Sequence, residues 1–421
     1  MPPHSLPRRA FLATTAVAAL PRVAVAQGPA RIVVIGGGFA GAACARALKT
    51  LDRALSVTLV EPNAVFIACP FSNAVIAGMR EIEAQRFGYD GVRRAGVTVA
   101  RATATEVDAT ARLVTLDDGT RLPYDRLVVA AGIDLRWDAL PGYDEAASTR
   151  MPHAWRAGEQ TSLLRRQLEA MDDGGVVVMS APANPFRCPP GPYERASLVA
   201  HYLKTRKPRS KLLLLDAKDA FSKQRLFTGA WKALYPAIVE WVPLSKGGKV
   251  ASVDPGAMTL TTDFATHKAA VANVIPPQRA ARIAATAGVA DRSGWCPVDP
   301  VSFESTLRPG VHVIGDAAIM GAMPKSAFSA NAQARICAAA IVARLAGREP
   351  VEPRPVNTCY SLVAPDRGIS VAGVYRPVNG QLADIPGAGG TSPPDASEDV
   401  RVQEARYAEA WFRTITTDTF G

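Results

Sequence analysis

The first part of the chain that carries a regular hydrophobic pattern begins at Arg31. Four apolar residues follow it and lead into a glycine-rich stretch, GGGFAG, at residues 36–41. Apolar positions then follow a helical spacing over residues 42–51, and a second short apolar run covers residues 57–60. This pattern predicts a buried strand, a tight turn, a helix and a second buried strand, in that order.

The glycine-rich stretch predicts a binding site for a dinucleotide. In such a turn Gly36 allows the tight bend, Gly38 lets the backbone approach a pyrophosphate, and Gly41 lets the helix pack on the strand. Glu61 ends the second predicted strand, twenty residues after Gly41, where an acid can hold the hydroxyl groups of a ribose. An isolated GxGxxG motif carries little weight, but the flanking strands and the acid make this one specific.

Two further segments resemble the two-dinucleotide-fold flavoproteins related to glutathione reductase. Residues 122–132 form a predicted strand that runs into a turn of small residues, and residues 305–318 contain a strand that ends in Gly315 and Asp316 before a helix. In that family the aspartate hydrogen-bonds a ribityl hydroxyl of FAD, and the N-terminus of the following helix faces the flavin or its phosphate. The resemblance implies that Gly315 and Asp316 bind FAD and that the FAD domain is split around an insertion.

The predicted fold class is α/β, with two Rossmann-like dinucleotide-binding domains of the glutathione reductase type and a small C-terminal α+β domain. We expect a leader over residues 1–26, a split FAD-binding domain over residues 27–141 and 283–354, a second Rossmann-like domain over residues 142–282, and a C-terminal domain over residues 355–421. The last domain contains a loop-rich segment at residues 379–397 and closes with an amphipathic helix near residues 402–412.

The second Rossmann-like domain is predicted to have lost its nicotinamide site. Its opening strand is present at residues 174–179, but residues 180–191 replace the expected glycine-rich turn and carry four prolines. Prolines present no N–H groups to a pyrophosphate, and side chains block its approach. We therefore expect no NAD(P) binding. Because residues 212–215 and Asp216 still imitate the second strand and its acid, residual nucleotide binding stays open as an alternative.

Composition and charge narrow the function further. The chain has 421 residues, of which 48% are hydrophobic and 20% charged, as in an ordinary globular protein of two or three domains. Apart from residues 11–20, no apolar run approaches the roughly 18 residues that cross a bilayer, so we expect no transmembrane anchor. The net charge of +10 comes without a basic run interleaved with aromatics, which disfavours nucleic acid and suits an anionic substrate or an acidic partner. The five histidines form no metal-ligand cluster, so no metal site is predicted.

Residues 1–26 predict a signal peptide of the twin-arginine type. Arg8 and Arg9 precede a modest apolar stretch that ends in a small-residue cleavage site at residues 24–26. Such a signal exports proteins that are already folded, so a cofactor can be bound before export. We expect a periplasmic protein whose cysteines lie in an oxidising compartment, with an ordinary secretory signal as the alternative.

The six cysteines form no CxxC or CxxCH motif, so the chain carries neither a thioredoxin-type site nor a c-type haem. Cys44 and Cys337 fall in predicted helices and are expected to be core residues. Cys188 occupies the position of the lost nicotinamide loop and should face the flavin, while Cys359 begins the C-terminal domain, which in such folds covers the isoalloxazine. A redox-active disulfide, a structural disulfide and two unpaired thiols all remain open for this pair.

Several motifs together resemble the flavoprotein subunit of flavocytochrome c sulfide dehydrogenase. They are the leader, the GGGFAG turn, the CPPGPYER segment at residues 188–195, the Gly-Asp motif and the NTCYS segment at residues 357–361. The resemblance implies an FAD enzyme that oxidises sulfide to sulfur or polysulfide and passes electrons to a c-type cytochrome subunit, which carries the haem. It also implies a redox-active disulfide between Cys188 and Cys359. Glu194 would be the nearby acid that moves a proton, with a surface or salt-bridged carboxylate as the alternative.

The resemblance also bears on how the flavin is held. Cys69 lies where the family attaches FAD through a thioether to the 8α-methyl group of the ring. Pro70 follows it in this sequence, where an aromatic residue is expected, so the chain departs from the family pattern at this point. Trp411, in the predicted C-terminal helix, is expected to lie over the flavin, with ordinary core packing as the alternative.

Two other functions remain open. A sulfide:quinone oxidoreductase shares this fold and its cysteine chemistry, but it would need an apolar quinone site and an amphipathic C-terminus that lies on a membrane. Residues 398–421 contain several acids and few basic residues, which disfavours membrane docking. The third possibility is a flavin-bearing subunit that binds its partners in a sulfur-oxidation system without turnover. Sulfide-dependent bleaching of the flavin would separate this subunit from either enzyme.

Overall fold

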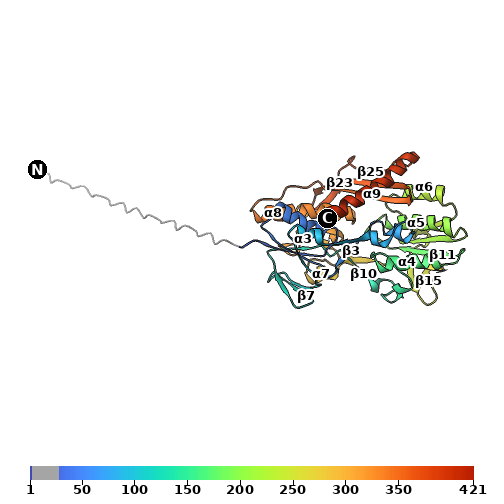
Figure 1. The fold of residues 1–421 in the computed structure, drawn as a ribbon, viewed down its shortest axis with the longest axis horizontal. Helices are drawn as coiled ribbons and strands as arrows, with labels where there is room; N and C mark the ends of the chain where they lie inside the picture. The colour runs from blue at the N-terminus through green and yellow to red at the C-terminus, as the bar shows by residue number, and fades with distance from the viewer. Residues whose placement is uncertain (2–27) are drawn as a thin grey trace.

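The structure is a computed structural model that describes residue 1 and residues 28–421. Apart from Met1, the predicted leader lies outside the described residues. The described chain is an α/β protein with one parallel sheet in each half of the molecule, and a C-terminal unit of antiparallel strands and helix α9 lies across the top of the view in Figure 1. The predicted fold class is therefore confirmed.

The first sheet has five parallel strands in the order β20–β9–β1–β2–β5. The bounds are Arg31–Ile35 for β1, Ser56–Val60 for β2, Thr98–Ala100 for β5, Arg126–Val129 for β9 and Val311–Val313 for β20. Most of β1 is buried because layers cover both faces of a parallel sheet. Helices α1 (Gly41–Leu51) and α8 (Ala327–Leu345) pack against each other, so two distant parts of the chain complete this unit.

Short elements surround the first sheet. An antiparallel sheet consists of β6 (Ala104–Asp108), β7 (Leu113–Leu116) and β8 (Arg121–Pro123). The others are the β3–β4 pair (Val65–Ile67 and Arg86–Gly88), the β10–β18 pair (Ile133–Leu135 and Gln278–Ala280), the β19–β21 pair (Cys296–Pro297 and Ala318–Ile319), and helices α2 (Ser72–Ile76), α3 (Asp90–Arg94) and α7 (Arg282–Thr286). The β10–β18 pair joins the segments that enter and leave the inserted unit.

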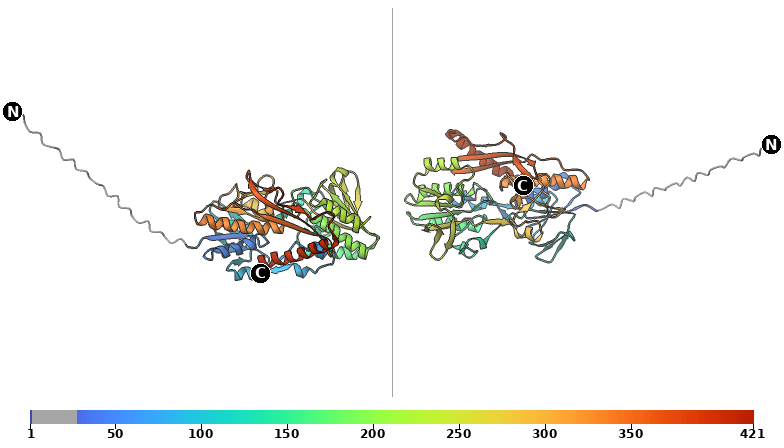
Figure 2. Two further views of the ribbon diagram at one scale, coloured as in Figure 1. Left: turned by 90° about the horizontal axis from the view of Figure 1, so that it is seen from above. Right: turned by 180° about the vertical axis from the view of Figure 1, so that it is seen from behind.

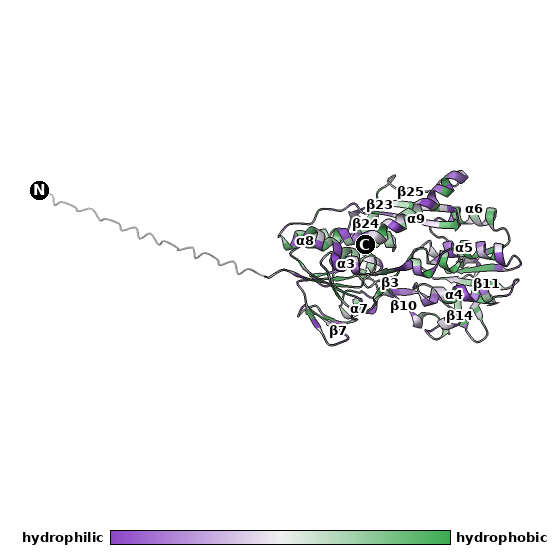
Figure 3. Ribbon diagram, in the orientation of Figure 1, coloured by the Kyte–Doolittle hydropathy of each residue, from purple (hydrophilic) through white to green (hydrophobic). Residues whose placement is uncertain are grey.

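The second sheet has four parallel strands in the order β13–β12–β11–β17. The bounds are Val176–Ala181 for β11, Lys211–Asp216 for β12, Val239–Val242 for β13 and Val271–Val274 for β17. Its helices are α4 (Glu159–Ala170), α5 (Gly191–Arg206) and α6 (Gln224–Leu234), and an antiparallel sheet of β14 (Val250–Asp254), β15 (Thr259–Thr262) and β16 (Thr266–Lys268) adjoins it. Figure 3 shows apolar residues along the strands and polar residues on the outer helices and loops.

The C-terminal unit pairs β22 (Val356–Ala364) with β23 (Arg367–Val378), and β24 (Gln381–Asp384) and β25 (Gly390–Thr391) add to β23. The segment expected to be loop-rich thus contains two short strands. Helix α9 (Glu398–Phe420) is longer than predicted, because two acids in its first turn favour an earlier start. It contacts β22 and β23 as well as α1 and α3, and Figure 2 shows it running between the two halves. No helix in the described chain is both long enough and apolar enough to span a bilayer.

Candidate functional site

One cavity of about 510 Å³ lies where the first sheet, the start of α5, strand β22 and helix α9 meet. The residues predicted for the site that line it are Gly36, Gly38, Glu61, Cys69, Cys188, Glu194, Gly315, Asp316, Cys359 and Trp411. Gly41, the remaining predicted residue, lies in the first turn of α1. The structure therefore brings distant parts of the sequence to one cavity, and the roles of these residues in it stay predictions.

The glycine-rich turn leaves no room for a side chain at Gly36 or Gly41. A Cβ atom on Gly41 would lie 1.8 Å from the carbonyl oxygen of Gly36, and Gly36 has a φ of 99° that favours glycine. Glu61, at the end of β2, accepts a hydrogen bond from the amide of Gly37 at 2.8 Å and two more from Asn63. The acid is thus fixed beside the turn at the carboxyl ends of the strands, where Rossmann folds bind their ligands.

Asp316 carries an unused hydrogen-bonding atom in the cavity wall. Its Oδ1 atom is buried and finds no partner among residues 28–421, and its Oδ2 atom lies 3.9 Å from Nη1 of Arg187. Burial raises the pKa of this carboxyl. A buried polar atom without a partner is costly, so a ligand hydroxyl would complete the site. Together with the glycine turn and Glu61, this acid gives the cavity the groups that fit FAD.

Cys188 lies in the turn that leads into α5, where a nicotinamide-binding domain would carry its glycines. Its φ of 58° is in the left-handed region, which costs a residue with a side chain about 1 kcal/mol or more. Two hydrogen bonds hold the turn, from the Cys188 amide to the carbonyl of Lys325 and from the Gly191 amide to the carbonyl of Cys188, both at 2.8 Å. Burial raises the pKa of the Cys188 thiol, and the charges of Cys359 and Glu194 raise it further.

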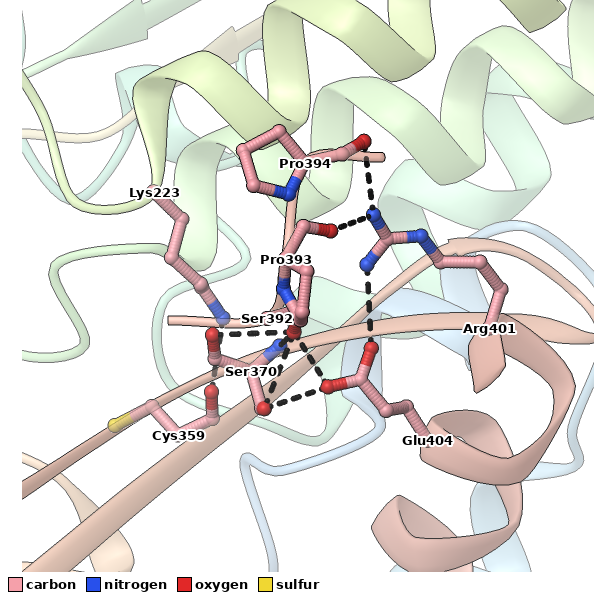
Figure 4. Close-up of polar contacts among 8 residues, drawn as sticks. All are labelled: Lys223, Cys359, Ser370, Ser392, Pro393, Pro394, Arg401 and Glu404. Atoms are coloured by element: carbon pink, nitrogen blue, oxygen red, sulfur yellow. Dashed lines mark hydrogen bonds and ion pairs between the residues drawn. The ribbon is translucent and has the colours of Figure 1, made fainter. Parts of the chain in front are cut away.

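Cys359 lies on β22 and lines the same cavity. Its Sγ atom is 3.3 Å from Nδ2 of Asn357, and its carbonyl accepts a hydrogen bond from Nζ of Lys223 at 2.9 Å. Figure 4 shows the lysine directed at the backbone of Cys359, whose sulfur points away from it. All six cysteines are free thiols in the structure, so the disulfide between Cys188 and Cys359 stays a prediction for the oxidised protein.

Glu194 is half-buried between the turn that carries Cys188 and strand β22, which carries Cys359. Its Oε2 atom accepts a hydrogen bond from Nδ2 of Asn73 at 2.7 Å, and its Oε1 atom accepts one from the amide of Leu362 at 2.8 Å. Burial raises its pKa, although both hydrogen bonds act in the other direction. The carboxylate is therefore neither on the surface nor in an ion pair with another described residue, and it joins α5 to β22.

Cys69 lies between β3 and α2 and is half-buried, with its Sγ atom 3.8 Å from the carbonyl oxygen of Trp155. The side-chain amide of Gln85 donates to the carbonyls of Ala68 and Pro70 on either side of it. The thiol thus belongs to the cavity wall on a loop with fixed carbonyls. The covalent bond to FAD stays a prediction.

Helix α9 brings Trp411 to the cavity. The indole ring stacks on Phe328 with 6.4 Å between ring centroids and 7° between planes. Nearly two turns from the start of the helix, Glu404 is buried and accepts hydrogen bonds from Ser370 at 2.7 Å and from Ser392. Figure 4 shows this carboxylate joining α9 to the C-terminal sheet, with Arg401 closing the cluster. The predicted position of Trp411 over the flavin stays a prediction.

At the carboxyl end of the second sheet, side chains of the same unit fill the place where a nicotinamide nucleotide would bind. Asp216, at the end of β12, is completely buried and accepts hydrogen bonds from Lys218 at 2.5 Å, Tyr193 at 2.7 Å and Trp241 at 3.1 Å. Lys218 also donates to the carbonyl of Pro182, in the segment that replaces the glycine-rich turn. The acid that would hold a ribose in an active nicotinamide site is thus occupied internally.

Sequence reasoning missed three charged or polar residues of the cavity region. Burial alone would lower the pKa of Arg187, but the charges of Cys69, Asp316 and Cys188 raise it overall. Burial lowers the pKa of Lys223 to about 8. Asn73 holds Glu194 and also accepts from Arg195 at 2.9 Å. Arg187 could have been found from its place beside Cys188, whereas Lys223 and Asn73 have no local sequence signal.

The fold and the cavity define a flavoprotein oxidoreductase with two Rossmann-like units. Residues 30–171 match the family model of pyridine nucleotide-disulphide oxidoreductases. The fold is similar to that of the sulfide:quinone oxidoreductase from Aquifex aeolicus, with a TM-score of 0.70 and 18% identity over 92% of each chain. It is also similar to putidaredoxin reductase in its covalent complex with putidaredoxin, with a TM-score of 0.66 and 18% identity over 91% of this chain and 93% of that one. These likenesses establish the fold.

Sequence comparison identifies the family. Residues 161–276 match the model of the central domain of the flavocytochrome c sulfide dehydrogenase flavoprotein chain, and residues 351–420 match the flavin-binding domain of that dehydrogenase. The flavoprotein chain from Chlorobaculum thiosulfatiphilum is 60% identical over 48 residues, which are 100% of that sequence and 11% of this one. The chain belongs to this family. The mitochondrial sulfide:quinone oxidoreductase of Mus musculus is more distant, at 22% identity over 68% of this chain and 65% of the mouse protein.

Proposed function

We propose that this chain is the flavoprotein component of an exported sulfide dehydrogenase. It binds FAD in the cavity, oxidises sulfide to sulfur or polysulfide through a disulfide between Cys188 and Cys359, and passes the electrons to a c-type cytochrome partner. The observation that carries the proposal is that a dinucleotide-binding turn, the unpartnered oxygen of Asp316 and both cysteines line one cavity. Family membership supports the same reading.

The cavity offers a group for each polar part of FAD. The glycine-rich turn at residues 36–41 would accept the pyrophosphate, Glu61 the ribose hydroxyls, and Asp316 a ribityl hydroxyl. Cys69 would attach the ring, and Trp411 would cover it. When bound, FAD supplies an acceptor that takes two electrons and releases them one at a time.

The residues around the two cysteines suit an attack by hydrosulfide on a disulfide. In that step a new S–S bond forms while the bond between Cys188 and Cys359 breaks, and the second sulfur leaves as a thiolate. Arg187 precedes Cys188 and Lys223 donates a hydrogen bond to the carbonyl of Cys359, so both cations lie close to the cysteine pair and favour the approach of an anion. Glu194, whose pKa is raised by burial, can hold a proton beside Cys188.

The acceptor and the compartment are proposed from the sequence. The leader carries a twin-arginine pattern, and an exported oxidase of sulfide needs an electron acceptor outside the cytoplasm. A c-type cytochrome meets this need, and its haem would lie on the partner because this sequence has no CxxCH motif. The internally occupied Asp216 supports the expectation that NAD(P) does not take part.

A sulfide:quinone oxidoreductase is the second candidate, since proteins of that name are similar to this chain in sequence and in fold. Helix α9 argues against it. Several apolar residues of this helix, among them Phe412 and Ile415, are buried against the protein itself, through contacts with β22, β23 and α1. The apolar face that these residues form is covered by the protein and is not free to enter a membrane.

Rapid anaerobic mixing of the FAD-loaded protein with sulfide, and then with cytochrome c or a soluble quinone, tests the proposal. We expect sulfide to bleach the flavin and cytochrome c to restore its absorbance. A flavin that sulfide leaves unchanged would indicate a binding subunit without turnover, and reoxidation by quinone alone would indicate the quinone reductase.

The variant Cys188→Ser tests the role of the cysteine pair. It should keep its FAD and lose sulfide-dependent reduction of cytochrome c, because Cys188 belongs to the chemistry and not to the dinucleotide-binding turn. Cys44→Ala, in the core between α1 and α8, is the matched control and should stay active. Sulfide oxidation by Cys188→Ser at the rate of the unchanged protein would overturn the disulfide mechanism.

A further inference from the structure

Asn357 lies two residues before Cys359 on β22, and its side-chain amide contacts two kinds of partner. The Oδ1 atom accepts hydrogen bonds from the hydroxyls of Ser326 at 2.6 Å and Ser329 at 3.1 Å. The Nδ2 atom lies 3.3 Å from Sγ of Cys359. Only 2% of the surface of Asn357 is exposed, so water has little access to either contact.

The two serines fix the direction in which the amide faces. Ser326 caps α8, because its Oγ atom accepts the amide hydrogen of Ser329 at 3.0 Å. The proton of the Ser326 hydroxyl is then available for Oδ1 of Asn357. Amide orientation follows from such partners, and two hydroxyl donors on Oδ1 leave the N–H group of Asn357 directed at the sulfur.

The amide of Asn357 can hydrogen-bond the sulfur of Cys359 in each state of the proposed reaction, as a thiol, a disulfide and a thiolate. A reduced Cys359 can donate its own proton to Oδ1 of Asn357, which lies 3.7 Å away. A disulfide sulfur and a thiolate have no proton, so they can only accept, and Nδ2 is the donor within reach. A hydrogen bond to a charged acceptor is about twice as strong as one to a neutral acceptor, so this contact favours the thiolate.

Cys188 has no corresponding donor within the described residues. Its side chain packs with Trp155, Phe186 and Ile275, and burial raises the pKa of its thiol. In thiol–disulfide exchange the less basic sulfur leaves faster. The surroundings of the two cysteines therefore favour Cys359 as the sulfur that leaves.

We propose that Asn357 is a catalytic residue that donates a hydrogen bond to Sγ of Cys359 and stabilises this sulfur as the departing thiolate. In this step the sulfur of hydrosulfide bonds to Sγ of Cys188 and keeps its proton, the bond between Cys188 and Cys359 breaks, and the electron pair of that bond leaves with Cys359. The products are a persulfide on Cys188 and a thiolate on Cys359. This inference rests on the proposed function, because it assigns a role within the same reaction.

Persulfide mapping in the FAD-loaded protein is the first arm of the test. Sulfide is added without oxygen, the thiols are alkylated, and mass spectrometry of the cysteine peptides reports which sulfur carries the persulfide. We expect the persulfide on Cys188, and we expect Asn357→Asp to lower the ratio of Cys188 to Cys359 persulfide about tenfold. Asn357→Asp keeps an acceptor for Ser326 and Ser329, removes the donor and places a carboxyl group beside the sulfur. Asn357→Ala removes the donor without adding a charge, and it should lower the ratio as well. A purely structural role would leave the ratio unchanged in both variants.

Alkylation of Cys359 in a Cys188→Ser background is the second arm, and it needs no sulfide. Iodoacetamide at fixed pH should modify Cys359 about tenfold more slowly when Asn357→Asp or Asn357→Ala is added, because the thiolate loses its donor. Asn331→Ala on α8, whose amide contacts Asp418 instead, is the control and should leave the rate unchanged. Equal alkylation rates with and without Asn357 would overturn the inference. Slower alkylation without persulfide on either cysteine would keep the hydrogen bond and overturn the proposed function.

Discussion

The two parallel sheets of this protein share a topology and differ at the ends of their strands. In the first unit, Glu61 accepts hydrogen bonds from the turn beside it, and Asp316 keeps a buried oxygen without a partner in the described chain. In the second unit, Asp216 is completely buried and receives three hydrogen bonds, one of them from Lys218, so a ligand cannot reach it. The difference lies in whether the acids at the strand ends line an open cavity or are enclosed by other side chains.

This comparison shows how one unit can keep a cofactor site while the other contributes side chains to that site. In the second unit a proline-rich segment stands in place of the glycine turn, and its last part carries Cys188 into the cavity of the first unit. The start of α5, which would face a pyrophosphate in a nicotinamide domain, carries Glu194 toward β22 instead. The second unit therefore contributes side chains to the shared cavity where a relative with two active sites would contribute a second nucleotide.

Adding one methyl group to the glycine-rich turn should break the first unit and have the largest effect. The new Cβ atom in Gly41→Ala would lie 1.8 Å from the carbonyl oxygen of Gly36, so the backbone of the turn must move. We expect the purified variant to retain less than about a tenth of the normal flavin, since the turn is the proposed pyrophosphate site. The ratio of flavin to protein absorbance measures this.

Gly229→Ala is the matched control for that change, because the same methyl group on α6 meets no atom within 4 Å. It should keep its full flavin content. Normal flavin content in Gly41→Ala would mean that the turn does not hold the cofactor. The proposed difference between the two units would then be wrong.

The tether at Cys69 sharpens the comparison, because only the first unit would hold its ligand covalently. If Cys69 binds the flavin, acid-precipitated protein stays yellow and its intact mass exceeds that of the chain by the mass of FAD. Cys69→Ala should release all of its flavin into the acid supernatant while still binding it at neutral pH through Glu61 and Asp316. A colourless precipitate from the unchanged protein would remove Cys69 from the cofactor site.

The parts of the site that the sequence predicts are those that depend on local order along the chain. Gly36, Glu61 and Asp316 each follow an apolar strand, and the carboxyl ends of parallel strands meet at one edge of a sheet. Lys223 and Asn357 could not be assigned in the same way. Lys223 reaches Cys359 across 136 positions of sequence, and the amide of Asn357 is oriented by serines on α8. Such contacts depend on how the units pack, which no local pattern records.

The same limit explains the errors in element bounds. Helix α9 extends well beyond residues 402–412 at both ends. The acids of its first turn favour the earlier start, whereas its last turns are stabilised by contacts that the sequence pattern does not contain. Arg46 on α1, for example, donates to the carbonyls of Thr417 and Asp418 in the last turn of α9. The carbonyl groups at the end of this helix thus find hydrogen-bond donors in another part of the fold.

Breaking the internal ion pair should weaken the second unit without restoring its nucleotide site. Lys218→Met leaves the buried carboxylate of Asp216 without its cation, and we expect the free energy of unfolding to fall by about 3 kcal/mol. Urea unfolding at neutral pH measures this, with the exposed Lys232→Met as the control. NADH and NADPH should leave the flavin oxidised in all three proteins. Rapid reduction by either would show that the second unit still binds nicotinamide.

The smallest effect we expect is a pH dependence of stability that comes from one of two buried lysines in the second unit. One of these lysines has an ionic partner and the other does not. Lys218 pairs with Asp216, whereas Nζ of Lys223 donates to the neutral oxygens of Cys359 and Ser361. Burial lowers the pKa of Lys223 from 10.5 to about 8. Between these values the unfolded chain binds a proton that the folded protein has lost, so the contribution of Lys223 to the free energy of unfolding rises with pH.

Lys223→Met should remove this rise. Between pH 8 and pH 9.5 the free energy of unfolding of the unchanged protein should gain about 2 kcal/mol relative to the variant, as a shift of that size implies. Urea unfolding at a series of pH values gives the difference, and Lys232→Met on α6, the helix that follows Lys223, should run parallel to the unchanged protein because its side chain is exposed. Parallel curves for Lys223→Met as well would show that Lys223 keeps its proton throughout this range. The cation beside Cys359 would then persist at alkaline pH, and sulfide oxidation should not decline there for lack of it.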